Sequence, residues 1–328
     1  MTKRRKTVTL KDLSERLGIS PYTISKALSG KPGMSEETRT RIIAVAAEMG
    51  YLRRGQPVRR ESPRHLAVVL PSRYISEYFY FADLIQGAGQ AAQAADCLLS
   101  VVGVTEEQMQ ADLPEQVRTS DGAIYLPMLD PPFIERALQQ GPPAVVINYP
   151  HRSWRVDSIV WDAEAGIGLC VDYLVGRGCR RIAYVGTPGV APGYRRRWIG
   201  FLEAMREHQL SPDPAEPIVP AAWPPDEVLR SVQSLLSNLD PLPDAFLCDF
   251  ETTALAVARV LSEQGRQDVA LACADQLSMT SRVTASIPHI YYHRDYAGRE
   301  AVKMLLHRLE HPDEPFRHVR IAVDFRMG

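Results

Sequence analysis

The sequence predicts an α/β protein in which a small all-α headpiece precedes a two-lobed core of doubly wound parallel sheets. Three observations predict this. Residues 9–50 have the pattern of three short amphipathic helices separated by glycines, and from residue 65 short apolar strands alternate with helical patterns. The formal net charge of −1 is also unevenly divided. Residues 1–64 carry 15 Lys and Arg against 6 Asp and Glu, whereas residues 65–328 carry 23 against 33.

The charge and composition limit the class of protein. A net charge of +9 on the first 64 residues predicts a polyanionic partner for that segment, and −10 on the remainder argues against binding to nucleic acid along the whole chain. The five cysteines form no C-x-x-C pair, which favours buried free thiols. No apolar run reaches the length of a membrane span, and no apolar segment follows the basic start. We therefore expect a cytoplasmic protein with no membrane partner.

Capping residues and glycines delimit the three predicted helices of the headpiece. The first begins after Thr9, a good N-cap, and ends at Gly18. The second begins after Ser20, and the third begins after Ser35 and ends at Gly50. Because a short turn joins the first two helices, we expect a helix-turn-helix.

The core is expected to contain buried strands alternating with amphipathic helices. The predicted strands are 66–70, 98–102, 123–126, 144–148, 182–185, 245–248 and 269–273. The predicted helices are about 80–95, 132–140, 163–177, 196–209, 226–238, 251–264 and 295–310. Strands this apolar are typical of parallel sheets covered on both faces. About 260 residues of this pattern favour two lobes with a cleft between them.

The second predicted helix is a candidate for insertion into the major groove of DNA. Its solvent face consists of Tyr22, Thr23, Ser25, Lys26 and Ser29. Hydroxyl groups can bind phosphates, and a lysine can donate to guanine or to phosphate. The alternative is a small helical bundle with an ordinary solvated face. The positive charge of the segment favours the DNA-binding interpretation.

The headpiece resembles the DNA-binding domain of the lactose-repressor (LacI/GalR) family. The resemblance rests on the gap-free run TLKDLSERLGISPYTISKALSG over residues 9–30, with SEETRTRI over 35–42 and MGY over 49–51. It implies that Pro21, Tyr22 and Lys26 contact bases. It also implies that Thr9, Ser20, Thr23 and Ser25 lie near phosphates, and Leu10 and Ser29 complete the predicted contacts of the headpiece.

The predicted linker departs from the family pattern. Arg53-Arg54 replaces the usual Pro-Asn, Pro57 replaces an alanine, and Arg60 stands where the family has a leucine wedge. Pro57 can begin a one-turn helix, because the first helical position needs no N–H donor. Arginine suits a narrow minor groove. We therefore include Arg54, Val58 and Arg60 among the predicted DNA contacts.

The core resembles the effector-binding domain of the same family, which is similar to periplasmic sugar-binding proteins. The motifs are LAVVLP at 66–71, SDGAI at 120–124, PAVVINYP at 143–150, GCRRIAYVG at 178–186 and RWIGF at 197–201. The resemblance implies that Arg197, Trp223 and Asp275 line the cleft. Where the family usually has Asn-Asp before a helix, Phe250-Glu251 stands here, so an effector could stack on Phe250. Weaker candidates for effector contact are Arg73, Tyr74, Asn148 and Tyr292.

Signals for catalysis or cofactor binding are weak. Residues 87–92, GAGQAA, match a relaxed dinucleotide fingerprint, but a helical pattern rather than a strand precedes them. Phosphate-binding-loop, zinc-protease and serine-hydrolase motifs are missing, and the eight histidines show no metal-ligand spacing. We expect no catalytic residues, no cofactor and no bound metal.

We therefore expect three parts: a helix-turn-helix domain at 1–52, a linker at 53–64 and an effector-binding and dimerisation core at 65–328. Lobe one would comprise about 65–161 and 293–320, and lobe two about 162–292 and 321–328. Such a chain would be a ligand-responsive transcriptional regulator, in most cases a repressor. As a homodimer it would bind a pseudo-palindromic DNA operator, and a sugar or sugar derivative in the cleft would change its affinity. The alternative is a free-standing small-molecule-binding protein or sugar-modifying enzyme with a basic N-terminus.

Overall fold

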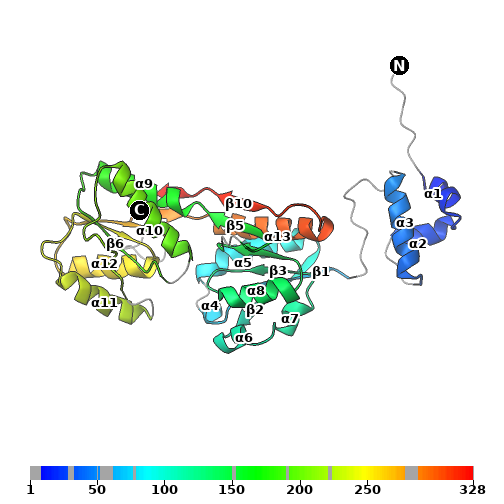
Figure 1. Ribbon diagram of the computed structural model, residues 1–328, viewed down its shortest axis with the longest axis horizontal. Helices are drawn as coiled ribbons and strands as arrows, with labels where there is room; N and C mark the ends of the chain where they lie inside the picture. Colours follow the sequence, from blue (N-terminus) through cyan, green and yellow to red (C-terminus); the bar gives the residue numbers. More distant parts are fainter. Residues whose placement is uncertain are drawn as a thin grey trace, which may run out of the picture. The chain divides into compact units, whose positions relative to one another are not determined.

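The computed structural model of the chain describes residues 9–28, 33–49, 51, 62–76, 79–149, 153–189, 192–220, 224–277 and 287–327 (Figure 1). The chain divides into two compact units, Met1–Arg64 and His65–Gly328. We call the first unit the headpiece and the second the core, and each is described by itself.

The headpiece contains the helices α1 (Leu10–Leu17), α2 (Pro21–Leu28) and α3 (Glu36–Glu48). Thr9 and Asp12 form a capping box at the start of α1, in which the Asp12 N–H donates to the Thr9 hydroxyl and the Thr9 N–H donates to the Asp12 carboxylate. Gly18 ends α1 with a φ of 68°, a left-handed conformation that glycine adopts without strain. The predicted helix-turn-helix is therefore present.

Among the described residues of the headpiece, the buried centre consists of Leu13, Ile24, Ala27, Ile42 and Ala46. They come from all three helices, so α2 is held on one side by α1 and on the other by α3. Because Ile24 and Ala27 occupy the inner face of α2, its opposite face remains available to a partner.

Lobe one of the core is a six-stranded sheet in the order β10-β5-β4-β3-β1-β2. The strands are β1 (Arg64–Pro71), β2 (Cys97–Val104), β3 (Gly122–Tyr125), β4 (Ala144–Ile147), β5 (Asp157–Trp161) and β10 (His318–Ile321). Its helices are α4 (Arg73–Ser76), α5 (Phe79–Ala94), α6 (Glu106–Gln110), α7 (Glu115–Arg118), α8 (Pro131–Gln140) and α13 (Arg294–Glu310). Alternate residues of β1 pack against α5 and α13 on one face and against α6, α7 and α8 on the other.

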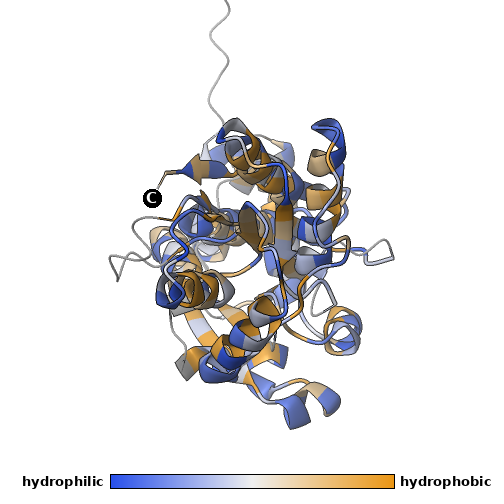
Figure 2. Ribbon diagram, turned by 90° about the vertical axis from the view of Figure 1, so that its left-hand side faces the viewer, coloured by the Kyte–Doolittle hydropathy of each residue, from blue (hydrophilic) through white to orange (hydrophobic). Residues whose placement is uncertain are grey.

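Lobe two is a five-stranded sheet in the order β11-β9-β8-β7-β6. The strands are β6 (Ile182–Val185), β7 (Ala245–Cys248), β8 (Ala270–Cys273), β9 (His289–Tyr291) and β11 (Asp324–Arg326). The helices are α9 (Ala163–Gly176), α10 (Pro192–Glu207), α11 (Pro225–Ser237) and α12 (Glu251–Glu263), with α9 and α10 on one face and α11 and α12 on the other. Hydrophobic and hydrophilic residues alternate along these helices, as Figure 2 shows.

The chain crosses between the lobes three times, after β5, after β9 and after β10. The second crossing delivers α13 to lobe one, where it packs along α5. The third crossing delivers the last strand, β11, to lobe two, where it pairs antiparallel with β9. One apolar cluster continues from lobe one into lobe two and includes Trp161, Ile290 and Tyr292 beside the crossings.

The seven predicted strands and ten predicted helices are present, with bounds shifted by a few residues. Several elements fall outside the predicted strands and helices, namely β5, β9, β10, β11 and the short helices α4, α6 and α7. The helix expected at 196–209 begins earlier, at Pro192, because proline and glycine are tolerated in a first helical turn, where the N–H groups have no partner within the helix. The edge pair β9–β11 departs from a wholly parallel sheet.

The described part of the chain contains no helix long and apolar enough to cross a bilayer. Its cysteines are all free, and four of them are buried, whereas Cys97 is half-buried. No cluster of potential metal ligands occurs among the described residues.

The glycines of the dinucleotide-like motif belong to helix α5 and serve its packing. A Cβ atom on Gly87 would overlap the main-chain carbonyl of Asp295 in α13, and one on Gly298 would overlap the carbonyl of Leu84 in α5. The two helices therefore approach each other more closely than a side chain on either glycine would permit. Gly89, two residues after Gly87, has open space at its Cβ position.

We predict that Gly87→Ala destabilises the core by about 1–3 kcal/mol or more, because α5 and α13 must move apart to accommodate one methyl group. Gly89→Ala is the matched control in the same helix. It should be neutral or stabilise the protein by up to about 1 kcal/mol through its higher helix propensity. Urea unfolding of both variants measures the difference, and equal effects would contradict the close-packing role of Gly87.

Candidate DNA-contacting helix and candidate effector cleft

The outer face of α2 carries most of the predicted DNA contacts of the headpiece. Tyr22 is 78% exposed, and Pro21 and Ser25 are also exposed, whereas Thr23 and Lys26 are half-buried. A Cβ on Gly33 would lie 2.6 Å from the Lys26 Nζ atom, so the ammonium group lies beside the main chain leading to α3. Tyr22 is thus the largest exposed side chain of α2, and its hydroxyl group can form hydrogen bonds.

Two predicted phosphate contacts already cap helices. The Ser20 Oγ atom accepts a hydrogen bond from the Thr23 N–H at 3.1 Å and lies 2.8 Å from the Thr23 hydroxyl. Thr9 is engaged in the capping box of α1, and Leu10 packs partly against the headpiece centre. These residues position α1 and α2, and each hydroxyl keeps further hydrogen-bonding capacity.

Five of the predicted site residues lie outside the described residues. They are Ser29, Arg54, Val58, Arg60 and Trp223.

The carboxyl ends of β7 and β8 place two aspartates at the junction of the lobes. Asp249 follows β7 and Asp275 follows β8, and both are almost completely buried. Arg197 reaches this edge from α10, and Arg294 reaches it from the start of α13. Ligands bind characteristically at this edge of an open parallel sheet.

Asp275 is at the centre of this group. Its Oδ1 atom accepts hydrogen bonds from the Arg294 guanidinium at 2.7 Å and from the Gln276 N–H at 2.8 Å. Its Oδ2 atom lies 3.7 Å from Arg197 Nη1, which is an ion pair but not a hydrogen bond. One oxygen of a fully buried carboxylate therefore has no hydrogen-bond donor among the described residues.

Arg197 lies between two aromatic rings. The centre of its guanidinium is 5.2 Å from the ring of Tyr194 and 5.3 Å from the ring of Tyr292, and its Nη1 donates to the main-chain carbonyl of Asp249. Tyr292 is buried, and its hydroxyl donates to the carbonyl of Ala274 at 2.8 Å. Arg197 is thus fixed by cation–π contacts on two sides.

The carboxyl of Asp249 is the most perturbed acid of the junction. Burial raises its pKa from 3.8 to about 7, a shift that the nearby charge of Asp275 reinforces and that the Thr187 N–H and Arg197 oppose. The Thr187 N–H donates to its Oδ2 atom at 2.7 Å. A Cβ on Gly186 would overlap this carboxyl, so the glycine permits the close approach.

The remaining candidates do not all reach this junction. Asn148 has a φ of 59°, and its amide lies against Gly193 in α10. Phe250 caps α12, with its ring centroid 6.3 Å from that of Tyr194. Arg73 turns away to Glu106 at 3.2 Å, and Tyr74 meets Phe81 edge-on. The structure therefore brings together Arg197, Asp275 and Tyr292, with Asn148 and Phe250 nearby.

The sequence interpretation missed Arg294, Gln276 and Tyr194. Gln276 contacts both lobes, because its side-chain amide donates to Asp83 of α5 at 3.2 Å and its carbonyl accepts from the Tyr292 N–H at 3.4 Å. One signal for Arg294 was available. A cation at the first position of a helix opposes the helix dipole, so it indicates a carboxylate partner elsewhere.

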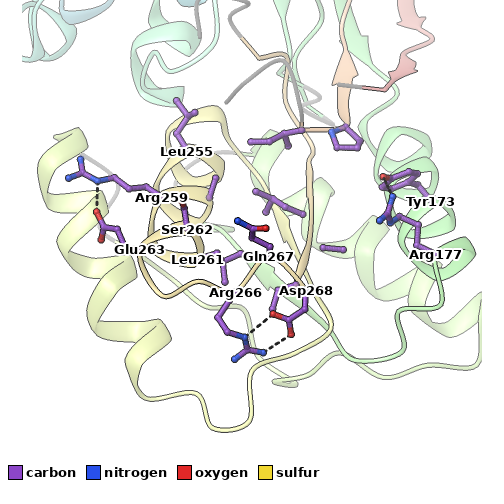
Figure 3. Close-up of a pocket in the computed structure, with 16 residues that line it drawn as sticks. Tyr173, Arg177, Leu255, Arg259, Leu261, Ser262, Glu263, Arg266, Gln267 and Asp268 are labelled. Atoms are coloured by element: carbon purple, nitrogen blue, oxygen red, sulfur yellow. Dashed lines mark hydrogen bonds and ion pairs between the residues drawn. The ribbon is translucent and has the colours of Figure 1, made fainter. Parts of the chain in front are cut away.

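Cavities in the described part of the core include one between the lobes and one on lobe two. The smaller lies between the lobes, where Pro127, Met128, Asn148 and Tyr149 face residues 192–194 and Arg197, and its volume of about 20 Å³ holds about one water molecule. The larger, about 880 Å³, lies on lobe two beside α9, α12 and β8 (Figure 3). None of the predicted effector residues lines it. Four of its charged side chains form ion pairs, Arg266 with Asp268 and Arg259 with Glu263, and Arg177 donates to the Tyr173 hydroxyl.

We take the junction between the lobes as the candidate effector site. The buried carboxylate with an unfilled acceptor position is there, and the larger cavity has no comparable group among its described lining residues. The small volume means that an effector must separate the two sides of the cleft or replace the side chains that fill it.

Comparison with known proteins agrees with both parts of this description. Residues 9–54 match the family described as "Bacterial regulatory proteins, lacI family", and residues 171–326 match the "Periplasmic binding protein-like domain". The HTH-type transcriptional repressor CytR of Escherichia coli strain K12 is 26% identical over 321 residues, which cover 94% of this chain and 92% of that protein.

Two solved structures share the fold. The complex of the transcriptional regulator CelR with cellobiose has a TM-score of 0.70 at 20% identity, and the lac repressor dimer bound to operator and the anti-inducer ONPF has a TM-score of 0.67 at 21% identity. Each comparison covers 98% of both chains.

The helix-turn-helix, the two-lobed core and the charged junction between the lobes define a DNA-binding transcriptional regulator with a small-molecule-binding domain. The chain belongs to the lactose-repressor (LacI/GalR) family. The family matched by the headpiece and the matched relative are transcriptional regulators, which favours a regulator over a free-standing binding protein or sugar-modifying enzyme.

We predict that Asp249→Asn changes how stability depends on pH. A carboxyl whose pKa is higher in the folded than in the unfolded state binds its proton more tightly when folded, so its ionisation lowers stability as the pH rises from about 4 to about 7. Asparagine does not ionise. The variant should therefore gain stability relative to the wild type between pH 5 and pH 8, by at most a few kcal/mol.

Thermal unfolding of the two proteins across this pH range measures the effect. Asp268→Asn is the control, because Arg266 lowers the pKa of that exposed carboxyl, which is then ionised in both states throughout the range. Its difference from the wild type should be constant between pH 5 and pH 8. A constant difference for Asp249→Asn as well would show that the Asp249 carboxyl is not perturbed by burial.

Proposed function

We propose that this protein is a repressor that binds a pseudo-palindromic operator as a homodimer, and that a sugar or sugar derivative between the lobes changes its operator affinity. The observation that carries the proposal is the incompletely hydrogen-bonded Asp275 at the junction of a core attached to a helix-turn-helix. A regulator that binds operator DNA would act in the cytoplasm. We assign it no catalytic role, cofactor or metal.

The proposed DNA contacts are those predicted from the sequence. Tyr22 and Lys26 would reach base edges, with Pro21 beside them, and the linker residues Arg54, Val58 and Arg60 would enter the minor groove. Hydroxyl-bearing residues of α1 and α2 would approach phosphates. Exposure of Tyr22 and Ser25 on one face of α2 supports this arrangement.

The proposed effector contacts are Arg197, Asp275 and Tyr292, with Asn148, Phe250 and Trp223. A guanidinium and a carboxylate together can bind vicinal hydroxyls. Tyr292 and Phe250 offer aromatic faces, which suit the apolar side of a sugar ring. A solved relative of the same fold carries cellobiose, which supports a carbohydrate as the first class to test.

The proposed mechanism is thermodynamic linkage between the two sites. An effector that binds one orientation of the lobes more tightly shifts the population toward it. The linker to the headpiece begins at lobe one, and the chain crosses between the lobes three times. A change of lobe orientation would therefore move the start of the linker relative to lobe two. Operator affinity and effector affinity then change by the same factor.

A second copy of the chain is proposed to cover the free edge of lobe one. Strand β2 forms this edge and exposes apolar side chains, with Leu98 at 59% and Val101 at 44%. Exposed apolar edge strands pair with other chains readily, so proteins usually cover them. A relative of the same fold was solved as a dimer on its operator, which favours a second copy as the cover.

We predict that Lys26→Ala weakens binding to the preferred operator by about 10- to 100-fold and relaxes base preference, because one good base contact contributes about 1–3 kcal/mol. Selection of the operator from random duplex DNA by the full chain, followed by titration at several salt concentrations, measures this. Lys303→Ala in the core is the matched control and should bind as the wild type does. Absence of sequence-specific binding by the wild type at moderate salt would refute the proposed function.

We also predict that Leu98→Asp weakens the dimer, because a charge at the centre of an apolar contact must be buried without a partner. Sedimentation should show a monomer at concentrations where the wild type is a dimer, with a matching loss of operator affinity. Leu169→Asp on α9, where the leucine is 39% exposed, is the control and should remain dimeric. A dimeric Leu98→Asp protein would exclude the β2 edge as the interface.

A further inference from the structure

We propose that the cleft selects an uncharged ring compound and rejects its phosphorylated or acidic derivatives. This inference rests on the proposed function of the cleft and specifies the chemical class of its ligand. It follows from the charges buried at the junction and from the hydrogen-bonding position that they leave open.

The charged groups at the junction do not add up to a positive site. Two guanidinium groups, those of Arg197 and Arg294, face the carboxyls of Asp249 and Asp275, and all four residues are more than nine-tenths buried. Asp83 adds a third carboxyl through Gln276. The described part of the cleft is therefore neutral when Asp249 is protonated and negative when it is ionised.

Both guanidinium groups are already used by the protein itself. Arg294 donates to Asp275 at 2.7 Å, while Arg197 donates to the Asp249 carbonyl and lies 3.7 Å from Asp275. The neighbouring Arg196 of α10 pairs with Glu164 of α9 at 3.7 Å. A phosphate or carboxylate would have to displace an internal carboxylate, which would then be buried without its partner.

The Asp275 oxygen that accepts no hydrogen bond suits a hydrogen-bond donor of a ligand and not an anionic group. The Asp275 Oδ2 atom is buried and accepts no hydrogen bond from the described residues. An ionised carboxylate can only accept, so a hydroxyl or N–H group of a ligand can satisfy it. A cationic ligand group at this oxygen would lie close to Arg197, and an anionic group would be repelled by Asp275 itself. A neutral donor avoids both repulsions.

The aromatic side chains indicate a ring. Tyr149 and Tyr194 line the space between the lobes, and the ring of Phe250 lies 6.3 Å from that of Tyr194. The ring of Tyr292 lies 5.3 Å from the centre of the Arg197 guanidinium. Aromatic walls around one buried carboxylate oxygen suit a flat or ring-shaped ligand whose polar edge meets Asp275.

The test uses the full chain and matched compounds that differ in charge. The panel contains glucose with glucose 6-phosphate, glucuronate and glucosamine, ribose with ribose 5-phosphate, adenosine and cytidine with their monophosphates, and cellobiose. The melting temperature is measured at pH 7.5 and constant ionic strength, because a ligand that binds the folded state raises it. We expect at least one neutral compound to bind, and its charged derivative to bind at least 10-fold more weakly.

A substitution at Asp275 shows whether this residue sets the discrimination. Asp275→Asn keeps the shape of the side chain but removes one negative charge, so the preference for the neutral compound should fall by about 10-fold or more. Asp172→Asn on α9, an exposed aspartate paired with His208, is the control and should keep the wild-type preference. Because Asp275→Asn alters a buried ion pair, circular dichroism and thermal unfolding without ligand measure whether each variant is folded.

Three results would overturn the inference: an anionic compound that binds more tightly than its neutral parent, glucosamine binding more tightly than glucose, or a panel in which no neutral compound raises the melting temperature. Operator binding by the same preparation is measured separately. Release of the operator by an anionic compound would overturn the charge selection and leave the proposed function intact. Failure to bind any operator would overturn the proposed function itself.

Discussion

The ion pair between Arg294 and Asp275, 2.7 Å long and buried, joins the two lobes of the core. Arg294 is the first residue of the helix that packs along α5 in lobe one, and Asp275 follows a strand of lobe two. Loss of either partner would leave a buried charge uncompensated, so the pair holds the start of α13, a helix of lobe one, against lobe two. It also orients the aspartate so that one oxygen remains for a ligand. The same contact therefore sets both the arrangement of the lobes and the chemistry of the cleft.

Two glycines permit close helix packing inside lobe one. Gly87 and Gly298 bring α5 and α13 within a distance that no side chain allows, and such packing resists sliding. Changes in lobe orientation must therefore occur at the three crossings. Two of the side-chain contacts beside the crossings are partly exposed: His293 meets Asp324 at 2.8 Å, and Arg320 meets Asp162 at 3.5 Å. Exposed ion pairs contribute little, about 0–1 kcal/mol each, so they can exchange partners at low cost.

Local signals in the sequence predicted most helices and strands, because caps, glycines and apolar runs act over a few residues. They did not predict β5, whose Asp157 and Ser158 look too polar for a buried strand. Asp157 is buried because Arg308, far along the chain, donates two hydrogen bonds to it. Arg294 was missed for the same reason, since its partner lies 19 residues away. Family resemblance supplied Arg197 and Asp275, which the structure brings together, and also Arg73, which turns to Glu106 instead. Local sequence patterns do not show which charged residues pair with partners far along the chain.

The division of charge along the chain has a counterpart inside the core. The headpiece segment carries 15 basic residues, and phosphates of DNA would be its natural partners. The core is acidic overall, and its described cleft holds two guanidiniums that are both committed to internal partners. Cells contain many phosphorylated metabolites as well as DNA. This protein attracts phosphate groups at its headpiece. Among the described residues of the cleft, no guanidinium is uncommitted and able to bind a phosphate. The cleft can therefore sense a neutral metabolite without competition from its phosphorylated forms. The separation of charge thus keeps the two binding functions chemically independent, while the crossings between the lobes keep them mechanically linked.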